Sequence, residues 1–519
     1  MVSNTAEEVP NSRLLTDLID GLVELPESHR PLLDRRVTGV NMDSRLLRSG
    51  DLFIACFGLN HDAREYIDEA IGSGVVAVLA ESGGKWQGIE IRGGVPIIAV
   101  DKLASKISEV AGRFYGKSSE TMSVIGITGT NGKTSCSHFI AQILEATGKP
   151  TGLIGTLGIG RYNDLKESQH TTPDAVVTQK ALAEMQKGGM QSVVMEVSSV
   201  GLHQHRVEAV RFDTAIFTNL SRDHLDYHDS MENYADNKRK LFLSSDLRSA
   251  IINIDDSYGL YMMDVLSREV KVFTYSLSNH TATVYAKSIQ LDRHGFTAEI
   301  VTPYGKGSIS CPLFGYFNIS NVLAALTALI SYFEKSGTVD IKNLFARISN
   351  LKPVVGRMEI IGSSDELTCI VDYAHTPDGL KSALTAIRDH FDGKVWCVFG
   401  CGGNRDRGKR PLMGEIAQAY ANKLIITDDN PRKESGEEIV KHILSGIEES
   451  SDVSVIRDRA RAIRFAIESA GPEDIVLVAG KGHENYQDIG GRRTVFSDAN
   501  QVRLELQKRC DSNRDKDKE

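Results

Sequence analysis

The chain has 519 residues, several times the length of a typical domain of about 100 to 150 residues, so more than one domain is expected. Hydrophobic residues make up 41% and charged residues 25%, a usage that excludes a largely disordered protein. The formal net charge is -9 without a dominant basic stripe, which argues against nucleic acid as the main partner.

The cysteines and the N-terminal segment predict the cellular compartment. The seven cysteines are scattered, odd in number and without a CxxC pair, a pattern typical of reduced thiols. The N-terminal segment lacks a basic stretch followed by an apolar one, and we see no run of about 18 apolar residues in the chain. We therefore expect a cytoplasmic protein with no membrane span.

Residues 1–118 are predicted to form a smaller N-terminal α/β domain. Short β-like runs alternate there with helical stretches, and a polar stretch near residue 118 predicts a linker. A central domain, 119–350, opens with a predicted strand at 123–128, and a break at 351–357 begins the third domain, 351–519. The whole is predicted to be an α/β protein of three domains.

The third domain carries four apolar runs separated by helical patterns, which favours a Rossmann-like parallel sheet. Each run ends in a polar or glycine-rich cluster. Open α/β sheets bind ligands at the carboxyl ends of their strands, so these clusters are expected to meet at one crevice. The runs are 368–371, 395–399, 424–427 and 475–479.

A phosphate-binding loop is the strongest single signal. The strand at 123–128 leads into a glycine-rich turn and then into a helix with one apolar face. Glycines let backbone N–H groups approach phosphate oxygens, Lys133 can reach the outer phosphates, and the Thr134 hydroxyl can ligate Mg²⁺. ATP is the expected ligand, on a central P-loop-type ATPase domain with a mostly parallel sheet. The predicted contacts are Gly129, Thr130, Asn131, Gly132, Lys133, Thr134 and Ser135.

The loop departs from the common phosphate-loop spacing, which would place a glycine at position 127, where Ile127 stands. The alternative interpretation is an ordinary glycine-rich turn between a strand and a helix.

Further motifs accompany this loop along most of the chain. The segments are 170–174 (HTTPD), 195–199 (MEVSS), 204–206 (QHR), 217–228 (FTNLSRDHLDYH), 317–321 (FNISN), 355–359 (VGRME) and 372–377 (DYAHTP). Together with the loop at 129–134 they resemble the Mur ligase family. The resemblance implies an ATP-dependent ligase that extends a UDP-linked muramoyl peptide through an acyl phosphate. That reaction serves peptidoglycan synthesis and, through the cell wall, cell shape and division.

The same resemblance implies a catalytic set of Lys133, Glu196, His224 and Lys238. Thr134 and Glu196 would hold the magnesium ion of ATP, and Glu196, His224 and a modified lysine would hold a second one. Lys238 matches the family lysine that reacts with CO₂ to form a carbamate, an anionic ligand suited to Mg²⁺. Without the family frame, Glu196 and His224 would be interpreted as structural, and Lys238 as a solvated helix residue.

Asn318, Arg357 and Asp372 resemble the family's remaining nucleotide contacts, and an interdomain salt bridge is the alternative role for Arg357. The UDP-muramoyl dipeptide site is implied in two parts of the chain, where turn and capping roles are the alternative. In the N-terminal domain it comprises Met42, Ser44, Leu59, Asn60 and His61, and in the central domain His170, Thr171, Thr172, Ser198, Gln204 and Arg206.

The Asp-Asn-Pro-Arg sequence at 429–432 follows a predicted strand and offers a planar guanidinium suited to a carboxylate. The family members that add meso-diaminopimelate carry this sequence. That amino acid has a second carboxylate at its far end, whereas lysine brings only an ammonium, which Arg432 would repel. A β-turn with an exposed arginine is the alternative. The implied contacts are Arg405, Asp429, Asn430, Pro431, Arg432, Gly480 and Glu484.

Small-molecule substrates and a monomer are therefore expected. A folylpolyglutamate synthetase, or a Mur ligase that adds another residue, is the nearest enzymatic alternative. A relative that has lost ligase activity and serves as a binding component is the alternative from another class. Lys133, Glu196, Lys238 and Arg432 are all present, which disfavours the latter.

Overall fold

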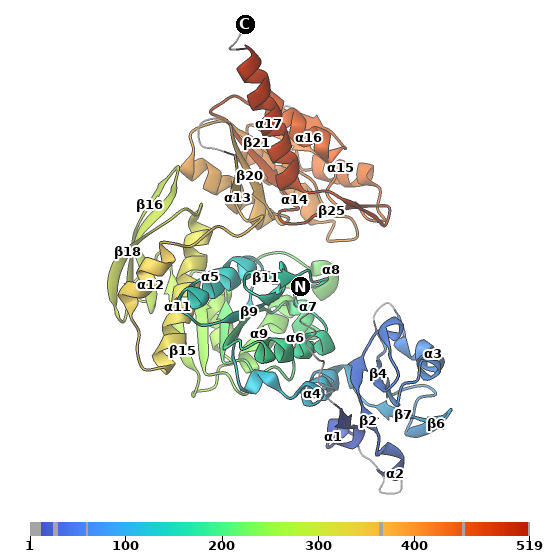
Figure 1. Ribbon diagram of the computed structural model, residues 1–519. Helices are drawn as coiled ribbons and strands as arrows, with labels where there is room; N and C mark the ends of the chain where they lie inside the picture. The colour runs from blue at the N-terminus through green and yellow to red at the C-terminus, as the bar shows by residue number, and fades with distance from the viewer. Residues whose placement is uncertain (1–11, 24–29, 59–60, 363–366, 449–451, 517–519) are drawn as a thin grey trace, which may run out of the picture. The chain divides into compact units, whose positions relative to one another are not determined.

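The computed structural model describes residues 12–23, 30–58, 61–362, 367–448 and 452–516 (Figure 1). Contacts divide the chain into two compact units. The first is Met1–Gly126, Lys149–Thr214 and Ser244–Leu247, and the second is Ile127–Gly148, Ala215–Leu243 and Arg248–Glu519. The boundaries of the three predicted domains stay a prediction, although each predicted domain carries its own large sheet.

The first unit contains a five-stranded sheet of order β3-β4-β5-β7-β6, parallel except where β6 pairs with β7. All five residues of β4 are buried, as expected for a strand covered on both faces. The elements up to α4 are β1 (Arg13–Leu14), α1 (Leu15–Ile19), α2 (Arg30–Leu33), β2 (Arg36–Val37), β3 (Gly39–Asn41), β4 (Asp51–Ala55), α3 (Ile67–Gly72), β5 (Ala77–Glu81), β6 (Ile89–Arg92), β7 (Val95–Val100) and α4 (Leu103–Tyr115).

Helix α4 ties this sheet to the rest of the first unit. The Ser108 hydroxyl accepts hydrogen bonds from the side chain of Gln179 at 3.3 Å and from the Ala209 amide at 3.0 Å. Ser108 is fully buried, so these bonds lie inside the unit. The remaining elements that begin in this unit are β8 (Ser123–Thr128), β9 (Thr151–Gly155), β10 (Gly158–Arg161), β11 (Asp164–Lys166), α6 (Ala175–Lys187), β12 (Ser192–Glu196), α7 (Ser199–His203) and β13 (Thr214–Phe217).

The largest sheet has eleven strands in the order β11-β10-β9-β12-β8-β13-β14-β15-β16-β17-β18. Strands β14, β15 and β16 pair in parallel, whereas β16, β17 and β18 form an antiparallel extension. The elements of the second unit up to α12 are α5 (Lys133–Ala146), α8 (Leu225–His228), α9 (Met231–Arg239), β14 (Ser249–Asn253), α10 (Tyr258–Met263), β15 (Lys271–Ser276), β16 (Val284–Asp292), β17 (Gly295–Thr302), β18 (Gly305–Cys311), α11 (Tyr316–Lys335) and α12 (Ile341–Ile348).

Helix α11 bears on the expectation that the chain has no membrane span, which stays a prediction. Among the described residues it is the one helix long and apolar enough to meet the length and composition criteria for a membrane span. Its most apolar window is 72% buried inside the protein. This burial is typical of the core helix of a globular domain.

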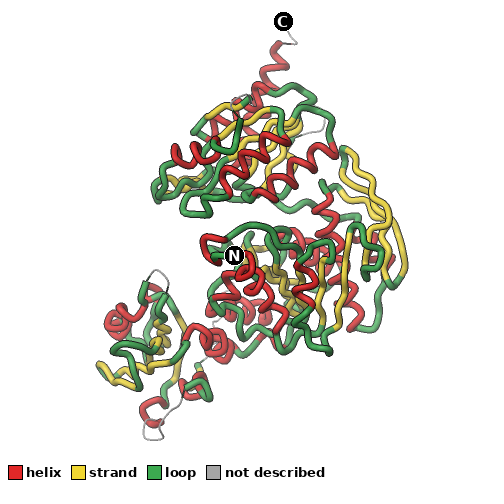
Figure 2. Tube along the Cα trace, turned by 180° about the vertical axis from the view of Figure 1, so that it is seen from behind, coloured by secondary structure: helices red, strands yellow, loops and turns green. Residues whose placement is uncertain are grey.

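The C-terminal sheet has the order β19-β20-β24-β21-β22-β23 and is parallel from β20 to β23. Its four central strands coincide with the four predicted apolar runs, which confirms the α/β prediction. Helices cover both faces (Figure 2). The elements are β19 (Glu359–Ile361), β20 (Thr368–Asp372), α13 (Pro377–His390), β21 (Val395–Phe399), α14 (Lys409–Tyr420), β22 (Lys423–Ile426), α15 (Gly436–Leu444), β23 (Val453–Val455), α16 (Arg459–Ser469), β24 (Ile475–Ala479), β25 (Tyr486–Ile489), β26 (Arg492–Val495) and α17 (Asp498–Lys516).

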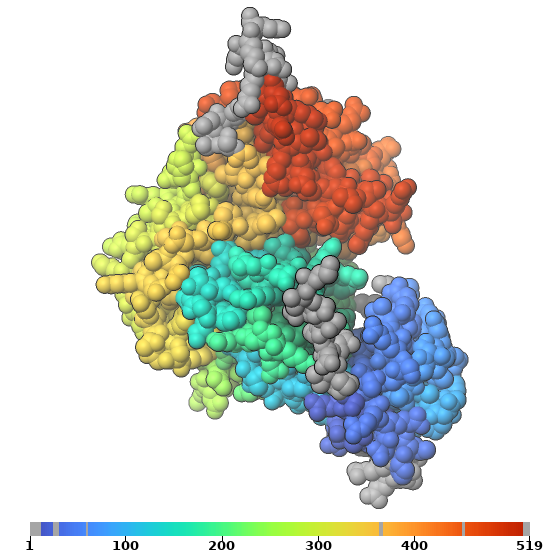
Figure 3. Space-filling view, in the orientation of Figure 1, coloured from blue at the N-terminus to red at the C-terminus, as the bar shows by residue number. Residues whose placement is uncertain are grey.

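Alternating side chains assign the helices to the two faces of this sheet. Ile370 and Leu477 point toward α13, α14 and α15, whereas Val371 and Val478 point toward α16 and α17. Helix α17 lies on the outside of its face, where the surface view shows it exposed (Figure 3). The carboxyl ends of β20, β21, β22 and β24 therefore lie at one edge, as predicted.

A buried ion pair joins α16, α17 and this edge. Arg459 Nε donates to Asp498 Oδ1 at 2.7 Å, and both side chains are fully buried. Arg459 Nη2 donates to Asp498 Oδ2 at 2.7 Å and to the Ala479 carbonyl at 2.9 Å. The last helix thus supports the end of β24, next to Gly480.

Candidate active site

The phosphate loop lies between β8 and α5, as the sequence predicts. Gly129 has φ +151° and Gly132 has φ +87°, conformations that favour glycine. A Cβ on Gly129 would lie 1.8 Å from Thr218 Oγ1. The loop is fixed because Asn219 accepts from the Thr130 amide at 2.8 Å and from the Asn131 amide at 2.9 Å. The glycines are therefore required for the close approach of two backbone segments.

Lys133 and Thr134 begin α5. Lys133 Nζ donates to the carbonyls of Gly129 and Thr130, both at 2.8 Å, so the ammonium lies over the loop. Thr134 is buried, and its Oγ1 accepts from Arg357 Nη2 at 3.1 Å. These positions suit a cation and a hydroxyl that meet a triphosphate.

Lys238 on α9 is 1% exposed, so its interpretation as a solvated helix residue is wrong. Its Nζ donates to the Gly129 carbonyl at 2.8 Å and lies 4.4 Å from the centre of the Tyr234 ring. Burial, with the charge of Lys133 adding to it, lowers the pKa of Lys238 well below its usual value. A desolvated amine of lowered pKa is a better nucleophile toward CO₂ because more of it is uncharged.

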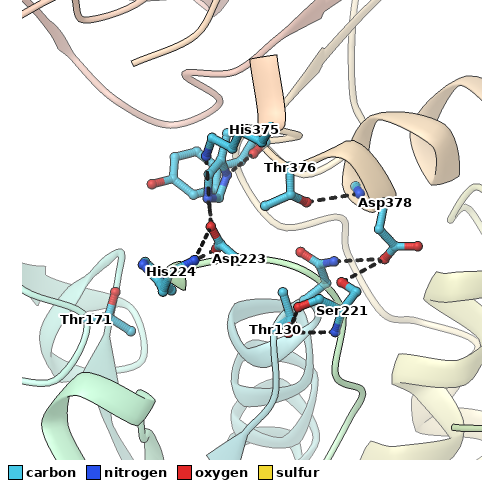
Figure 4. A network of polar contacts seen from close by, with 12 residues as sticks. Thr130, Thr171, Ser221, Asp223, His224, His375, Thr376 and Asp378 are labelled. Atoms are coloured by element: carbon cyan, nitrogen blue, oxygen red, sulfur yellow. Dashed lines mark hydrogen bonds and ion pairs between the residues drawn. The ribbon is translucent and has the colours of Figure 1, made fainter. Parts of the chain in front are cut away.

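A buried carboxylate lies beside His224 (Figure 4). Asp223 Oδ2 lies 3.3 Å from His224 Nε2 and 3.9 Å from His375 Nε2, and Asp223 Oδ1 lies 3.9 Å from Lys409 Nζ. Burial alone would raise the pKa of Asp223, but these neighbours outweigh it and lower that pKa. The carboxylate is therefore ionised at neutral pH and compensates the charges around it.

The surroundings of the two histidines favour their uncharged forms. Burial lowers the pKa of His224 and lowers that of His375 to about 4. An uncharged imidazole can ligate a metal. Sequence reasoning missed Asp223, His375 and Lys409, although two of them lie inside motifs that it singled out.

Asp378 also contacts the phosphate loop (Figure 4). Its Oδ2 accepts from Asn131 Nδ2 at 3.1 Å and from Ser221 Oγ at 3.3 Å. Asp378 lies in the first turn of α13, which Thr376 caps by accepting from the Gly379 amide at 3.0 Å.

Arg357, Asp372 and Asn318 occupy the second unit with the phosphate loop. Arg357 lies over the Tyr373 ring at 4.3 Å, and no ion pair among the residues that the structure describes includes it. Its alternative role in a salt bridge is therefore unsupported. Asp372 accepts from the Met358 amide at 2.7 Å, and burial raises its pKa. Asn318 Nδ2 donates to the Phe314 carbonyl at 3.0 Å.

Glu196 ends β12 in the first unit and is 1% exposed. Its carboxylate accepts from the Thr156 amide at 2.8 Å and from the Thr156 hydroxyl at 3.1 Å. Thr156 Oγ1 also lies 3.0 Å from Thr171 Oγ1. Thr156 therefore links the two predicted site residues, and sequence reasoning missed it.

The predicted residues of 172–206 lie close to Glu196. Thr172 Oγ1 donates to the Glu196 carbonyl at 2.9 Å and accepts from the Ser198 amide at 2.9 Å. Arg206 Nη1 donates to the Thr172 carbonyl at 2.6 Å, and its Nη2 donates to Gln204 Oε1 at 2.6 Å. Ser198 caps α7, as its alternative role predicted.

The other predicted substrate residues are less well defined. His170 is exposed, and partial burial lowers its pKa. Met42 packs against the core of the five-stranded sheet, and Ser44 begins a short 3₁₀ turn. His61 is exposed. Leu59 and Asn60 lie outside the described residues.

The predicted metal ligands are divided between the units: Glu196 belongs to the first, and Thr134, His224 and Lys238 belong to the second. Within the described ranges, no group of three or more His, Cys, Asp or Glu side chains is arranged to hold a metal ion. The donor types still suit magnesium, provided that Lys238 becomes an anionic carbamate. The metal sites stay a prediction.

The predicted amino-acid site comes together at the carboxyl edge of the C-terminal sheet. Asn430 Nδ2 donates to Glu484 Oε2 at 2.7 Å, and the buried Lys481 Nζ donates to the same oxygen at 2.8 Å. Gly480 has φ +114°, and a Cβ there would lie 2.5 Å from Asp429 Oδ2. Sequence reasoning did not single out Lys481.

The two arginines of this site approach the same glycine. Arg432 has φ +53°, and its Nη1 donates to the Gly403 carbonyl at 2.8 Å. A Cβ on Gly402 would lie 2.8 Å from Arg432 Nη1 and 3.8 Å from Arg405 Cγ. The Arg432 guanidinium lies at this glycine, and a guanidinium suits an anionic ligand such as a carboxylate. Arg432 is half-buried and bonded, unlike an exposed β-turn arginine.

This fold, with its phosphate loop and the two arginines, is that of an ATP-dependent ligase. Residues 127–329 match the Mur ligase middle domain, and residues 356–482 match the Mur ligase glutamate ligase domain. The chain belongs to the Mur ligase family.

Within that family, several similar proteins share one name. The chain is 44% identical to the UDP-N-acetylmuramoyl-L-alanyl-D-glutamate--2,6-diaminopimelate ligase of Coxiella burnetii, over 96% of this chain and 100% of that protein. It is 45% identical to the enzyme of the same name from Pseudomonas aeruginosa, over 93% and 96%. A solved structure of a ligase of that name is 34% identical, with TM-score 0.68, covering 96% of this chain and 99% of the other.

More distant structures share the fold alone. The MurF ligase from Thermotoga maritima in complex with ADP is 17% identical, with TM-score 0.62, covering 92% of this chain and 100% of the other. A folylpolyglutamate synthase of Mycobacterium tuberculosis complexed with ADP is 18% identical, with TM-score 0.60, covering 73% and 92%. The folylpolyglutamate alternative therefore has support from the fold only.

Replacing Gly129 with alanine is expected to abolish ATP binding while the protein stays folded. The added Cβ would lie 1.8 Å from Thr218 Oγ1, so the loop must move away from the phosphate-binding arrangement. Binding of ATP measured by calorimetry checks this prediction, and Gly148→Ala, with φ +76° but no atom within 4 Å of the new Cβ, is the matched control. Normal ATP affinity in Gly129→Ala would contradict it.

Proposed function

We propose that this protein joins meso-diaminopimelate to UDP-N-acetylmuramoyl-L-alanyl-D-glutamate, converting ATP to ADP and phosphate, in cytoplasmic peptidoglycan precursor synthesis. The observation that carries this proposal is that the side chains of Arg405 and Arg432 both approach Gly402, together with the bonded cluster of Asn430, Lys481 and Glu484. The name shared by relatives that align over nearly the whole chain supports the same reaction.

The first chemical step would transfer the γ-phosphoryl group of ATP to the D-glutamyl carboxylate. Carboxylate is a poor acylating group, and both reactants are anions, so positive charge must offset their repulsion. Lys133, which begins α5 beside the phosphate loop, supplies part of that charge. Bound Mg²⁺ would neutralise the phosphate oxygens, held by Thr134, Glu196, His224 and carbamylated Lys238.

The buried state of Lys238 supports its carbamylation. An ammonium there would lie in a desolvated position near a second cation, Lys133, and both effects favour the uncharged amine. Reaction of that amine with CO₂ forms an N–C bond and releases a proton. The product is an anion, which suits a position beside the cation of Lys133.

The second step would be attack of the diaminopimelate amine on the acyl phosphate. Arg432 and Arg405 would bind the distal carboxylate of the amino acid, and Glu484 would receive its distal ammonium. Lysine has no carboxylate at that end, so it would meet the two guanidiniums with a like charge. This charge pattern makes the site selective for diaminopimelate.

The UDP-muramoyl dipeptide would bind to the first unit. Thr171, Thr172, Ser198, Gln204 and Arg206 offer hydroxyl, amide and guanidinium groups near Glu196, and Met42, Ser44, Leu59, Asn60 and His61 would contact the nucleotide part. A monomer is proposed because each of these groups belongs to one chain.

The proposal is tested by product formation. Purified protein is incubated with ATP, Mg²⁺ and UDP-muramoyl-L-Ala-D-Glu, with diaminopimelate and lysine offered separately, while phosphate release and product mass are followed. We expect the diaminopimelate tripeptide, little lysine product, and no reaction with Lys133→Ala. A protein that binds these compounds without forming a product would instead be the inactive binding component.

A further inference from the structure

Two loops of the C-terminal sheet, both of which carry predicted amino-acid contacts, are bonded to each other. The glycine-rich loop, residues 400–408, follows β21, and the arginine turn, residues 427–434, follows β22. The Gly403 amide donates to the Asn430 carbonyl at 2.9 Å, and the Lys433 amide donates to Asn404 Oδ1 at 3.2 Å. A Cβ on Gly403 would lie 1.9 Å from the Pro431 carbonyl oxygen, so the backbones touch.

Glu434, the last residue of the arginine turn, bonds to the glycine-rich loop at Asn404 and to Arg410 at the start of α14. Its Oε1 accepts from the Asn404 amide and from Arg410 Nη2, the latter at 3.1 Å. Its Oε2 accepts from Arg410 Nη1 at 3.1 Å and lies 3.4 Å from Arg407 Nη2. The Glu434 carboxylate therefore uses both oxygens to join the two loops.

Arg410, the partner of Glu434, is buried and bonded on several sides. The Arg410 side chain is fully buried at the start of α14, and that of Glu434 is 12% exposed. Arg410 Nη2 also donates to the Gly402 carbonyl at 3.3 Å, and Nη1 lies 3.0 Å from His442 Nδ1 on α15. A bidentate pair at this depth resists displacement because either partner alone would be a buried, uncompensated charge.

We propose that Glu434 is a positioning residue for amino-acid selection, which sets the spacing between Arg405 and Arg432 by clamping the glycine-rich loop onto the arginine turn. This inference rests on the proposed function. Arg405 follows Asn404, whose amide bonds to Glu434, and Arg432 lies two residues before Glu434 in the chain. Only one or two residues of backbone therefore separate the bonds of Glu434 from each of the two arginines.

If Glu434 acts in this way, its loss should change the KM for one substrate only. Two guanidiniums can share one carboxylate only while their separation is held to within a fraction of an ångström, and misplacement weakens binding steeply. The bonds of Glu434 are made within the C-terminal sheet region, and none of them involves the phosphate loop. The KM for diaminopimelate should therefore rise, while the KM for ATP should not.

Glu434→Gln is the main test, because it keeps the shape and one acceptor oxygen but loses the charge and the bidentate pair. We expect the KM for diaminopimelate to rise about tenfold with kcat changed by less than about threefold, and the preference for diaminopimelate over lysine to fall. The control is Glu437→Gln, whose exposed carboxylate pairs with Lys441 on α15. The control should keep all wild-type constants.

A double variant, Glu434→Ala with Arg410→Met, keeps the test valid if a single variant unfolds. It removes both charges together, so no buried charge is left unpaired. Thermal unfolding verifies that it folds, and its KM for diaminopimelate should rise at least as much as in Glu434→Gln. An unchanged KM for diaminopimelate in folded variants, or an equal rise for all three substrates, would overturn the inference. Absence of diaminopimelate ligation by the wild type would refute the proposed function instead.

Discussion

Lys238→Ala is expected to lower kcat by about 100-fold to 1000-fold or more, the range seen when a preorganised charged group is lost from an active site. The physical reason is that the lysine amine supplies the nitrogen of the carbamate, while CO₂ supplies its carbon and both oxygens, and alanine offers no amine that can react with CO₂. The fold should survive, because an uncharged methyl replaces a buried, desolvated amine. Steady-state rates with all three substrates measure the loss.

Chemical rescue separates a lost carbamate from a damaged fold. A short carboxylic acid such as acetate can place an anionic oxygen in the space that Lys238 vacates, so part of the activity should return with added acid. Lys240→Ala, a substitution of an exposed lysine two residues away, should keep full activity without rescue. Carbon-13 resonance spectra in labelled bicarbonate should show a carbamate in the wild type that Lys238→Ala lacks. A fully active alanine variant would remove Lys238 from the mechanism.

Arg432→Ala is expected to raise the KM for diaminopimelate by about 10-fold to 100-fold, which corresponds to loss of one charge-assisted hydrogen-bonded contact. The KM for ATP should stay unchanged because the Arg432 side chain bonds within the glycine-rich loop, through the Gly403 carbonyl. Kinetics with diaminopimelate and lysine as separate substrates measure both effects. Lysine should become the relatively better substrate, since the repelling charge is gone.

The Arg432 side chain also holds its own turn, which requires a second variant. Its Nη1 donates to the Gly403 carbonyl, so alanine removes a structural hydrogen bond as well as a charge. Arg432→Lys keeps the charge and a similar backbone cost but loses the planar fork, and it should fall between the wild type and alanine. Lys433→Ala, at an exposed neighbour, should leave the KM for diaminopimelate unchanged. Unaltered diaminopimelate kinetics in Arg432→Ala would refute the assignment.

Local sequence patterns were sufficient to predict the phosphate loop and the C-terminal sheet. The strand at 123–128, its glycine turn and the helix that begins at Lys133 form a continuous segment, so periodicity and glycine spacing predict them together. The central strands of the last sheet are similarly continuous apolar runs. The residues of the amino-acid site could be expected to converge because parallel strands present their carboxyl ends at one edge.

Contacts between distant segments could not be predicted from the sequence. Asp223, His375 and Lys409 meet although they lie on three separated segments, and neither composition nor period relates them. The clamp of Glu434 and Arg410 joins two loops by side chains that resemble ordinary surface residues in the sequence. Lys238 sits in a polar helical stretch, so only the fold reveals that it is buried.

Because Arg459 pairs with Asp498 on α17, the amino-acid site depends on an intact last helix. A protein that terminated before Asp498 would keep every predicted contact residue, yet it would lack both the counter-ion of Arg459 and the apolar side chains of α17, such as Val502, that pack on this face of the sheet. Loss of the partner in a buried ion pair alone costs about 3 to 5 kcal/mol, a large part of the stability of a domain. Nonsense or frameshift alleles in this final stretch should therefore behave as nulls, although they lie downstream of the whole catalytic apparatus.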